Sequence, residues 1–247
     1  MTTPELEALT ERGLLNRVLA DLLHAAVRAR LNMIISGPGD SGRTTLLRAL
    51  GCSVSGYERI ATIETIPQMN LSRSGRLVLE LSGPAAASML PTALTQNVHR
   101  LLVDDMDGDV ALPLLQAITG GASGSMVTVE AASPSQAVDR LATWAAVPIG
   151  AAAPAARLVH RAVDLVVHLA RLSNGAPAGT GRFVAHLEEA DHQAADGEHS
   201  VLRPLFAPVP GQPRAVFQNL PLCIDRLEHH GFDRAALADA SLTWGRW

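Results

Sequence analysis

Lysine is absent from this 247-residue chain, and all twenty of its cationic side chains are arginine. Lysine is normally among the commonest residues. In a chain without lysine, an arginine at a position that usually holds lysine is therefore weaker evidence for lost chemistry than it would be in an ordinary sequence. Cysteine is scarce too. Cys52 and Cys223 form no CxxC or Cys/His cluster, which argues against a disulfide scaffold or a zinc site and favours a reducing compartment.

Long apolar runs and an excess of positive charge are also missing. No uncharged stretch reaches the length needed to span a bilayer, and the acidic start TTPELEALTERG lacks the features of a secretory leader. The formal net charge of -4 and the pI near 6.1 leave no broad cationic surface, so nucleic acid is not expected as a partner. We expect a cytoplasmic protein.

Hydrophobic residues make up 47% of the chain, enough to bury a large core. Short apolar runs predict strands at NMIIS (32–36), 58–64, 76–81, 99–104, 125–130 and 164–170. Helical periodicity covers 4–30, 108–118, 134–146 and 153–163. This alternation predicts an α/β fold in which a mostly parallel sheet is covered on both faces.

Changes in residue composition and hydrophobic pattern along the sequence divide the chain into three expected parts. We expect residues 1–30 to form N-terminal helices and residues 31–172 to form the α/β core. After residue 172 the sequence turns to SNGAPAGTG and then to strand-like runs, RFVAHLEEA and VLRPLFAPV, followed by a helical LPLCIDRLEHHG. We expect residues 173–247 to be a β-rich appendage closed by that helix.

The stretch IISGPGDSGRTTLLRAL (34–50) runs from an apolar strand through a glycine-rich turn into a helical pattern. Its spacing matches the phosphate-binding P-loop, GxxxxGK[ST]. In such a turn the backbone N–H groups and the helix N-terminus hold phosphate. The predicted nucleotide-binding residues are Gly37, Pro38, Gly39, Asp40, Ser41, Gly42, Arg43, Thr44 and Thr45. A glycine-rich turn without a ligand is the alternative.

Two positions in this loop decide its chemistry. Thr44 is placed to coordinate Mg²⁺ through its hydroxyl. Arg43 stands where the motif has lysine, and a planar, forked guanidinium does not replace a compact ammonium conservatively in a tight cradle. Nucleotide binding can survive this exchange, whereas loss of one well-aimed transition-state donor costs about 10²- to 10³-fold in rate.

A second candidate site is HRLLVDDMDG (99–108), an apolar strand that ends in Asp104 and Asp105. In P-loop NTPases an acidic residue at the end of such a strand holds Mg²⁺, and a neighbouring carboxylate polarises water. We therefore predict a metal site formed by Thr44, Asp104 and Asp105. A strand that merely ends in an acidic turn is the alternative.

The order of these segments resembles the CpaF-type ATPases of the type II/IV secretion family, the ring-forming motors behind Tad pili. The resemblance covers about residues 5–240 and rests on AAVRARLNMIISG, ERIATIE, LLVDDMDGDVALPLLQAITGG, GSMVTVEAASPSQAVDRL and DLVVHLARL. It implies a RecA-like core, a hexameric ring, and ATP with Mg²⁺. The chain starts where the core of that family starts, so the resemblance also implies that the family's separate N-terminal domain is lacking.

The same resemblance assigns roles by position. Arg43 corresponds to the Walker A lysine, Thr44 to the Mg²⁺ ligand, Glu64 to the first acidic-box glutamate and Asp105 to the Walker B glutamate. The predicted catalytic residues are thus Asp105, Glu64 and Arg43. The chain departs from the family pattern at Gln68, Thr95, Asn97, Asp104, Asp107, Ala122 and Glu130.

These departures leave two hypotheses about function. The first is an ATP-binding secretion or pilus motor whose hydrolysis is weak, because Asp105 has a shorter arm than glutamate and a misplaced group costs on the order of 10²-fold. The second is an inactive pseudo-ATPase that acts as a structural or regulatory partner. Either would form a homo-oligomer, or a hetero-oligomer with an active homologue, and would dock at the inner face of the membrane on a secretion or pilus platform.

Overall fold

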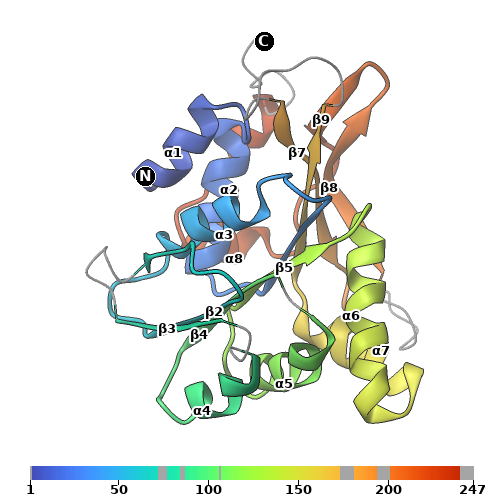
Figure 1. Cartoon of the computed structure of the whole chain (residues 1–247). Coiled ribbons are helices and arrows are strands. Elements are labelled where there is room, and N and C mark those ends of the chain that lie inside the picture. Colours follow the sequence, from blue (N-terminus) through green and yellow to red (C-terminus); the bar gives the residue numbers. More distant parts are fainter. Residues whose placement is uncertain are drawn as a thin grey trace.

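A computed structural model gives the fold of the chain (Figure 1). The structure describes residues 2–71, 77–83, 87–105, 107–172, 181–193 and 201–239. Its strands are β1 Met33–Gly37, β2 Ile60–Glu64, β3 Val78–Ser82, β4 Arg100–Asp104, β5 Met126–Glu130, β6 Leu165–Arg171, β7 Arg182–Ala190, β8 Leu202–Val209 and β9 Gln212–Phe217. Its α-helices are α1 Pro4–Glu11, α2 Arg17–Arg28, α3 Arg43–Gly51, α4 Leu90–Leu94, α5 Gly108–Thr119, α6 Pro134–Ile149, α7 Ala152–Ala162 and α8 Ile224–His229.

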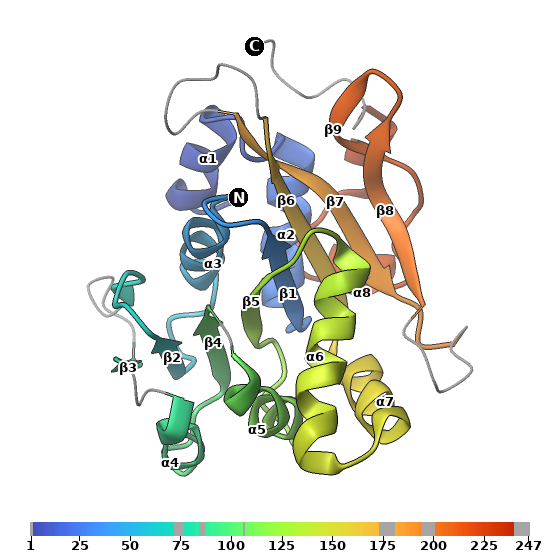
Figure 2. The ribbon, with the colours of Figure 1, turned by 45° about the vertical axis from the view of Figure 1, so that its right-hand side comes forward.

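The nine strands that the structure describes belong to one sheet with the order β3-β2-β4-β5-β1-β6-β7-β8-β9. The strands from β3 to β6 in that order are parallel, whereas β7, β8 and β9 pair antiparallel. The predicted fold class, α/β with a mostly parallel sheet and added C-terminal strands, is confirmed. Figure 2 shows these added strands continuing the central sheet beside β6.

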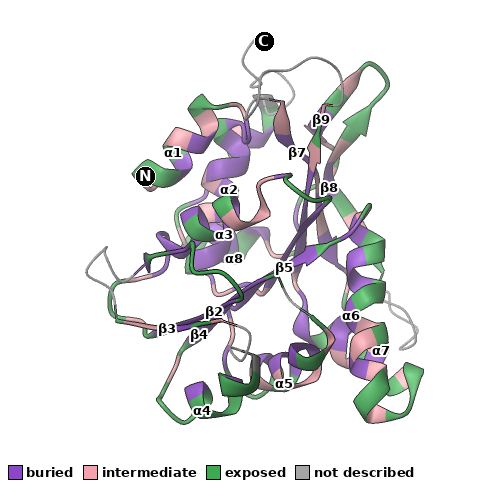
Figure 3. Ribbon diagram, viewed as in Figure 1, coloured by how far each residue is buried: buried purple, intermediate pink, exposed green. Residues whose placement is uncertain are grey.

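Two layers of helices cover the sheet, and each layer encloses its own hydrophobic cluster. One cluster takes its side chains from α1, α2, α3 and α8, and the other from α4, α5, α6 and α7. Figure 3 shows the central strands as a buried layer between the helices. Alternation along β1 explains the division, because Met33 and Ile35 belong to the first cluster while Ile34 belongs to the second.

The carboxyl ends of the parallel strands bring the candidate site together. In the register of the sheet, Gly37 at the end of β1 pairs with Glu130 at the end of β5. Glu64 at the end of β2 pairs in the same way with Asp104 at the end of β4. In an open α/β sheet, ligands bind in the crevice at this edge.

Local sequence patterns predicted most of these elements within a few residues, although residue 76 of one expected strand lies outside the described residues. No sequence pattern predicted β9 or the short helix α4. Among the described residues, every helix falls short of the length and apolarity that a membrane-crossing segment requires.

Candidate nucleotide site

The P-loop connects β1 to α3 through a turn that depends on glycine. Gly37 has a φ of 154°, and a Cβ atom there would lie 2.5 Å from Ser41 Oγ and 2.7 Å from the carbonyl oxygen of Leu169. Gly42, the residue before α3, has a φ of 98°. Glycine at 37 lets the loop pack directly against the end of β6, and glycine at 42 supplies the left-handed backbone that starts the helix.

The loop offers unpaired donors to an anion. Within the described ranges, no side chain caps the N-terminus of α3, so the first N–H groups of the helix lack the partner that a capping residue would supply. Ser41 is 1% exposed, and its hydroxyl has no hydrogen-bond partner among the described residues. Buried polar groups are normally paired. Together with the positive end of the helix dipole, these donors fit a phosphate group.

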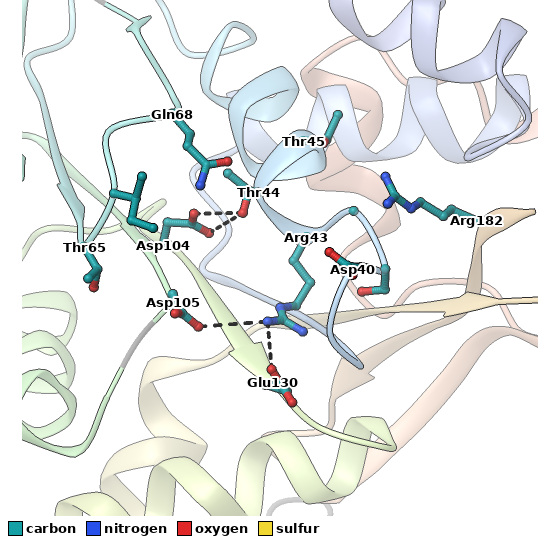
Figure 4. Close-up of a pocket in the computed structure, with 13 residues that line it drawn as sticks. Asp40, Arg43, Thr44, Thr45, Thr65, Gln68, Asp104, Asp105, Glu130 and Arg182 are labelled. Atoms are coloured by element: carbon teal, nitrogen blue, oxygen red, sulfur yellow. Dashed lines mark hydrogen bonds and ion pairs between the residues drawn. The ribbon is translucent and has the colours of Figure 1, made fainter. Parts of the chain in front are cut away.

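A cavity of about 420 Å³ opens in front of this loop (Figure 4). Its lining combines α3 and the P-loop with the ends of β2, β4, β5 and the start of β7. The lining residues are Asp40, Ser41, Gly42, Arg43, Thr44, Thr45, Thr65, Ile66, Gln68, Asp104, Asp105, Glu130 and Arg182. Four carboxylates and two guanidinium groups are among them, so the walls carry more negative than positive charge.

Thr44 and Asp104 meet at one end of the cavity. The Thr44 hydroxyl donates to the Asp104 carboxylate at 2.8 Å, and the same hydroxyl lies 3.1 Å from its second oxygen. Thr128 on β5 donates to Asp104 Oδ1 at 2.8 Å, so the carboxylate is fixed from two sides. Asp104 is 7% exposed. Mg²⁺ prefers carboxylate and hydroxyl oxygens, and this pair fits that ion.

Arg43 does not extend into the cavity as a free cation. Its Nη1 donates to the carbonyl oxygens of Gly37 and of Pro38, the latter at 2.7 Å. Its Nη2 donates to Glu130 Oε2 at 3.3 Å and lies 3.9 Å from Asp105 Oδ1. The side chain is 11% exposed. The guanidinium is thus folded back onto its own loop and is held by two carboxylates across the cavity (Figure 4).

The two acidic residues predicted to activate water are in different environments. Asp105 lines the cavity with a side chain that is 70% exposed, and its backbone, at a φ of 54°, is held by a 2.7 Å hydrogen bond from its N–H to Thr128 Oγ1. Glu64 is 2% exposed, and its Oε2 accepts from the N–H groups of Gln68 and Met69 at 2.7 and 2.9 Å. Glu64 thus holds the turn after β2.

The structure therefore brings most of the predicted residues together. Asp40, Ser41, Gly42, Arg43, Thr44, Thr45, Asp104 and Asp105 line the cavity, whereas Gly37, Pro38, Gly39 and Glu64 do not. Their binding and catalytic roles remain predictions. Sequence reasoning missed Arg182, because it lies on β7 far along the chain and only the order of strands in the sheet brings it to the P-loop. Gln68 and Glu130 were recognised only as departures from the family pattern.

A family model described as "Type II/IV secretion system protein" matches residues 2–201. The chain belongs to this family. PtlH, a type IV secretion system protein of Bordetella pertussis, is 34% identical over 130 residues, which are 49% of this chain and 38% of PtlH. VirB11 of Brucella suis is 28% identical over 197 residues, covering 74% of this chain and 53% of VirB11. The chain thus spans less than two thirds of these relatives.

Two solved ATPase structures support the fold. The crystal structure of the VirB11 ATPase from the Brucella suis type IV secretion system, in complex with sulphate, matches with a TM-score of 0.63 and 28% identity, covering 76% of this chain and 56% of that one. The Legionella pneumophila ATPase DotB matches with a TM-score of 0.54 and 15% identity, a likeness that shows the fold alone.

Proposed function

We propose that the protein binds ATP with Mg²⁺ as part of a secretion or pilus system and hydrolyses it slowly. Binding is supported by the unpaired donors of the P-loop and by the contact between Thr44 and Asp104. These two residues would hold the ion, which offsets the phosphate charge when it is bound. The excess of carboxylates around the cavity makes the ion a condition for triphosphate binding, because like charges would otherwise meet.

Slow hydrolysis rests on one observation, the pairing of Arg43 with its own loop and with Glu130. A cation that is already hydrogen-bonded and ion-paired must break those contacts before it can stabilise charge on a transferring phosphoryl group. Of the two predicted bases, Asp105 lines the cavity and Glu64 does not. We therefore assign the water-activating role to Asp105, whose carboxylate is also drawn toward Arg43.

The finer assignments are proposals of the same kind. The CpaF-like subtype rests on the order of the sequence motifs, while the relatives named above are PtlH and VirB11. A hexameric ring, a cytoplasmic location with docking at the membrane, and partnership with an active homologue rest on membership of the family. A mass measurement in solution, with and without ATP and Mg²⁺, tests the ring directly. A monomer under both conditions would contradict it.

An inactive pseudo-ATPase is the second candidate. It is favoured by the ion pairs of Arg43 with Glu130 and Asp105, which engage the loop cation and the proposed base with each other. In that case nucleotide binding would serve assembly or regulation. The two candidate functions both include nucleotide binding and differ in whether ATP is hydrolysed.

A fluorescent ATP analogue and a phosphate-release assay separate these possibilities. We expect saturable binding with Mg²⁺, at least about 10-fold weaker binding when EDTA removes the ion, and slow phosphate release. Binding with no release above the buffer blank would support the pseudo-ATPase. If the analogue does not bind under either condition, the nucleotide-binding proposal is wrong.

Variants of Arg43 and Glu130 test the cause of slow turnover. In Arg43→Lys the ammonium still faces Glu130, so we expect little gain, whereas Arg43→Lys combined with Glu130→Gln frees the cation and should raise phosphate release by about 10-fold or more. The matched control is Arg17→Lys in α2, where an exposed arginine pairs with Asp21. Equal rates in the double variant and the control would show that this ion pair does not limit hydrolysis.

A further inference from the structure

Arg182 is a second cation at the P-loop. It is the first residue of β7, and its Cδ lies 3.6 Å from the position that a Cβ on Gly42 would occupy. It lines the 420 Å³ cavity in front of the P-loop and also a smaller adjoining cavity of about 90 Å³ between α1 and α3. That smaller cavity is lined by Leu9, Arg12, Leu14, Gly42, Thr45 and Arg182.

The two cations at the cavity differ in what they contact. Arg43 is occupied by loop carbonyls and by Glu130. Within the part of the chain that the structure describes, no hydrogen bond or ion pair engages the guanidinium of Arg182. A guanidinium at the start of α3 with no protein acceptor matches the geometry of a phosphate, which it can bind through two parallel N–H groups.

The position of Arg182 also indicates how a bound nucleotide would be oriented in the cavity. Thr44 and Asp104 mark the end that fits Mg²⁺, whereas Thr45 and Gly42 are shared with the smaller cavity. Figure 4 shows Arg182 on the opposite side of the α3 N-terminus from Asp104. A nucleotide with its metal-bound phosphates at Asp104 therefore has its nucleoside end toward Arg182 and α1.

On this geometry, and resting on the proposed nucleotide binding, we propose that Arg182 binds the phosphate nearest the nucleoside. The nucleoside then leaves the P-loop on the side of α1, where Leu9 and Leu14 offer apolar surface. Arg182 thus supplies a phosphate contact that Arg43, held by Glu130, does not. ADP and ATP share the phosphate nearest the nucleoside, so Arg182 contributes equally to the binding of both.

Titrations of ADP and ATP, each with Mg²⁺, test the assignment on Arg182→Ala and Arg182→Gln. A charge-assisted hydrogen bond to phosphate corresponds to about 10- to 100-fold in affinity, and both nucleotides should weaken by the same factor. Arg182→Lys should recover part of the loss. Arg171→Ala is the matched control, because Arg171 pairs with Arg182 in the sheet but is exposed and does not line the cavity.

The outcomes separate this inference from the proposed function. Unchanged ADP and ATP affinity in Arg182→Ala, with binding intact in the wild type, would overturn the role of Arg182 alone. A loss for ATP without a loss for ADP would place Arg182 at the terminal phosphate and overturn the direction. Absence of binding in the wild type would overturn both. Thermal unfolding of each variant checks that it is folded, and Arg182→Gln retains bulk should Arg182→Ala prove unstable.

Discussion

At the scale of single residues, the most buried charge among the described residues lies at the edge of the sheet opposite the candidate nucleotide site. Arg100, at the start of β4, is 1% exposed and donates to both oxygens of Glu58 at 2.7 and 2.8 Å. It also donates to the carbonyl oxygen of Val27 at the end of α2. Arg30 contacts Glu58 as well. The network ties α2 to β4.

Glu58→Gln should therefore destabilise the protein by about 3–5 kcal/mol, because removing one partner leaves a buried charge without compensation. Urea unfolding followed by circular dichroism measures the loss. Asp21→Asn, which breaks the exposed ion pair with Arg17, is the control and should change the free energy of unfolding by less than about 1 kcal/mol. Equal effects would contradict a structural role for the buried network.

At the scale of elements, the connection between β1 and α3 depends on residue 37 being glycine, which has no side chain. Gly37→Ala places a methyl group against Ser41 Oγ and the Leu169 carbonyl, so the loop must shift. We expect a loss of about 1–3 kcal/mol in stability and weaker nucleotide binding. Gly39→Ala is the matched control, since nothing lies within 4 Å of its added Cβ. If both variants bind nucleotide alike, the tight packing at Gly37 does not set the loop.

The same connection shows how far sequence alone could go. Strand β1, the glycine turn and α3 could be predicted because their signals are local: an apolar run, fixed glycine spacing and helical periodicity. The contact of Arg43 with Glu130 and the position of Arg182 beside the P-loop could not be predicted in this way. Both depend on which strands are neighbours, and no short pattern records the strand order. Strand β9 was not predicted because its short, proline-containing run lacks a regular alternation of apolar and polar residues.

At the scale of the whole molecule, the sheet buries a histidine that responds to pH. His168 on β6 is 5% exposed, its Nδ1 lies 2.9 Å from Ser36 Oγ on β1, and its ring lies 5.9 Å from that of His186 on β7. Burial, assisted by His186 and opposed by Glu188, lowers its pKa to about 4. The folded protein therefore keeps His168 neutral where the unfolded chain would protonate it.

The free energy of unfolding should consequently fall as pH decreases from about 6.5 toward 4, because the unfolded chain binds a proton at His168 that the folded protein does not bind. Between pH 7 and pH 5 the contribution of this group is about 2 kcal/mol. Urea unfolding across this range should show a steeper decline in the wild type than in His168→Gln. Parallel pH profiles for the two proteins would contradict the assignment to His168.

The continuity of the sheet has a mechanical consequence. Only β6 separates the strand that carries the P-loop from β7, a span of about 10 Å at ordinary strand spacing. Because the first residue of β7 forms part of the cavity wall, a displacement of β7 would move that part of the wall. A load applied to the hairpin of β8 and β9 would travel through backbone hydrogen bonds to the side of the cavity where Arg182 lies, where we place the phosphate nearest the nucleoside.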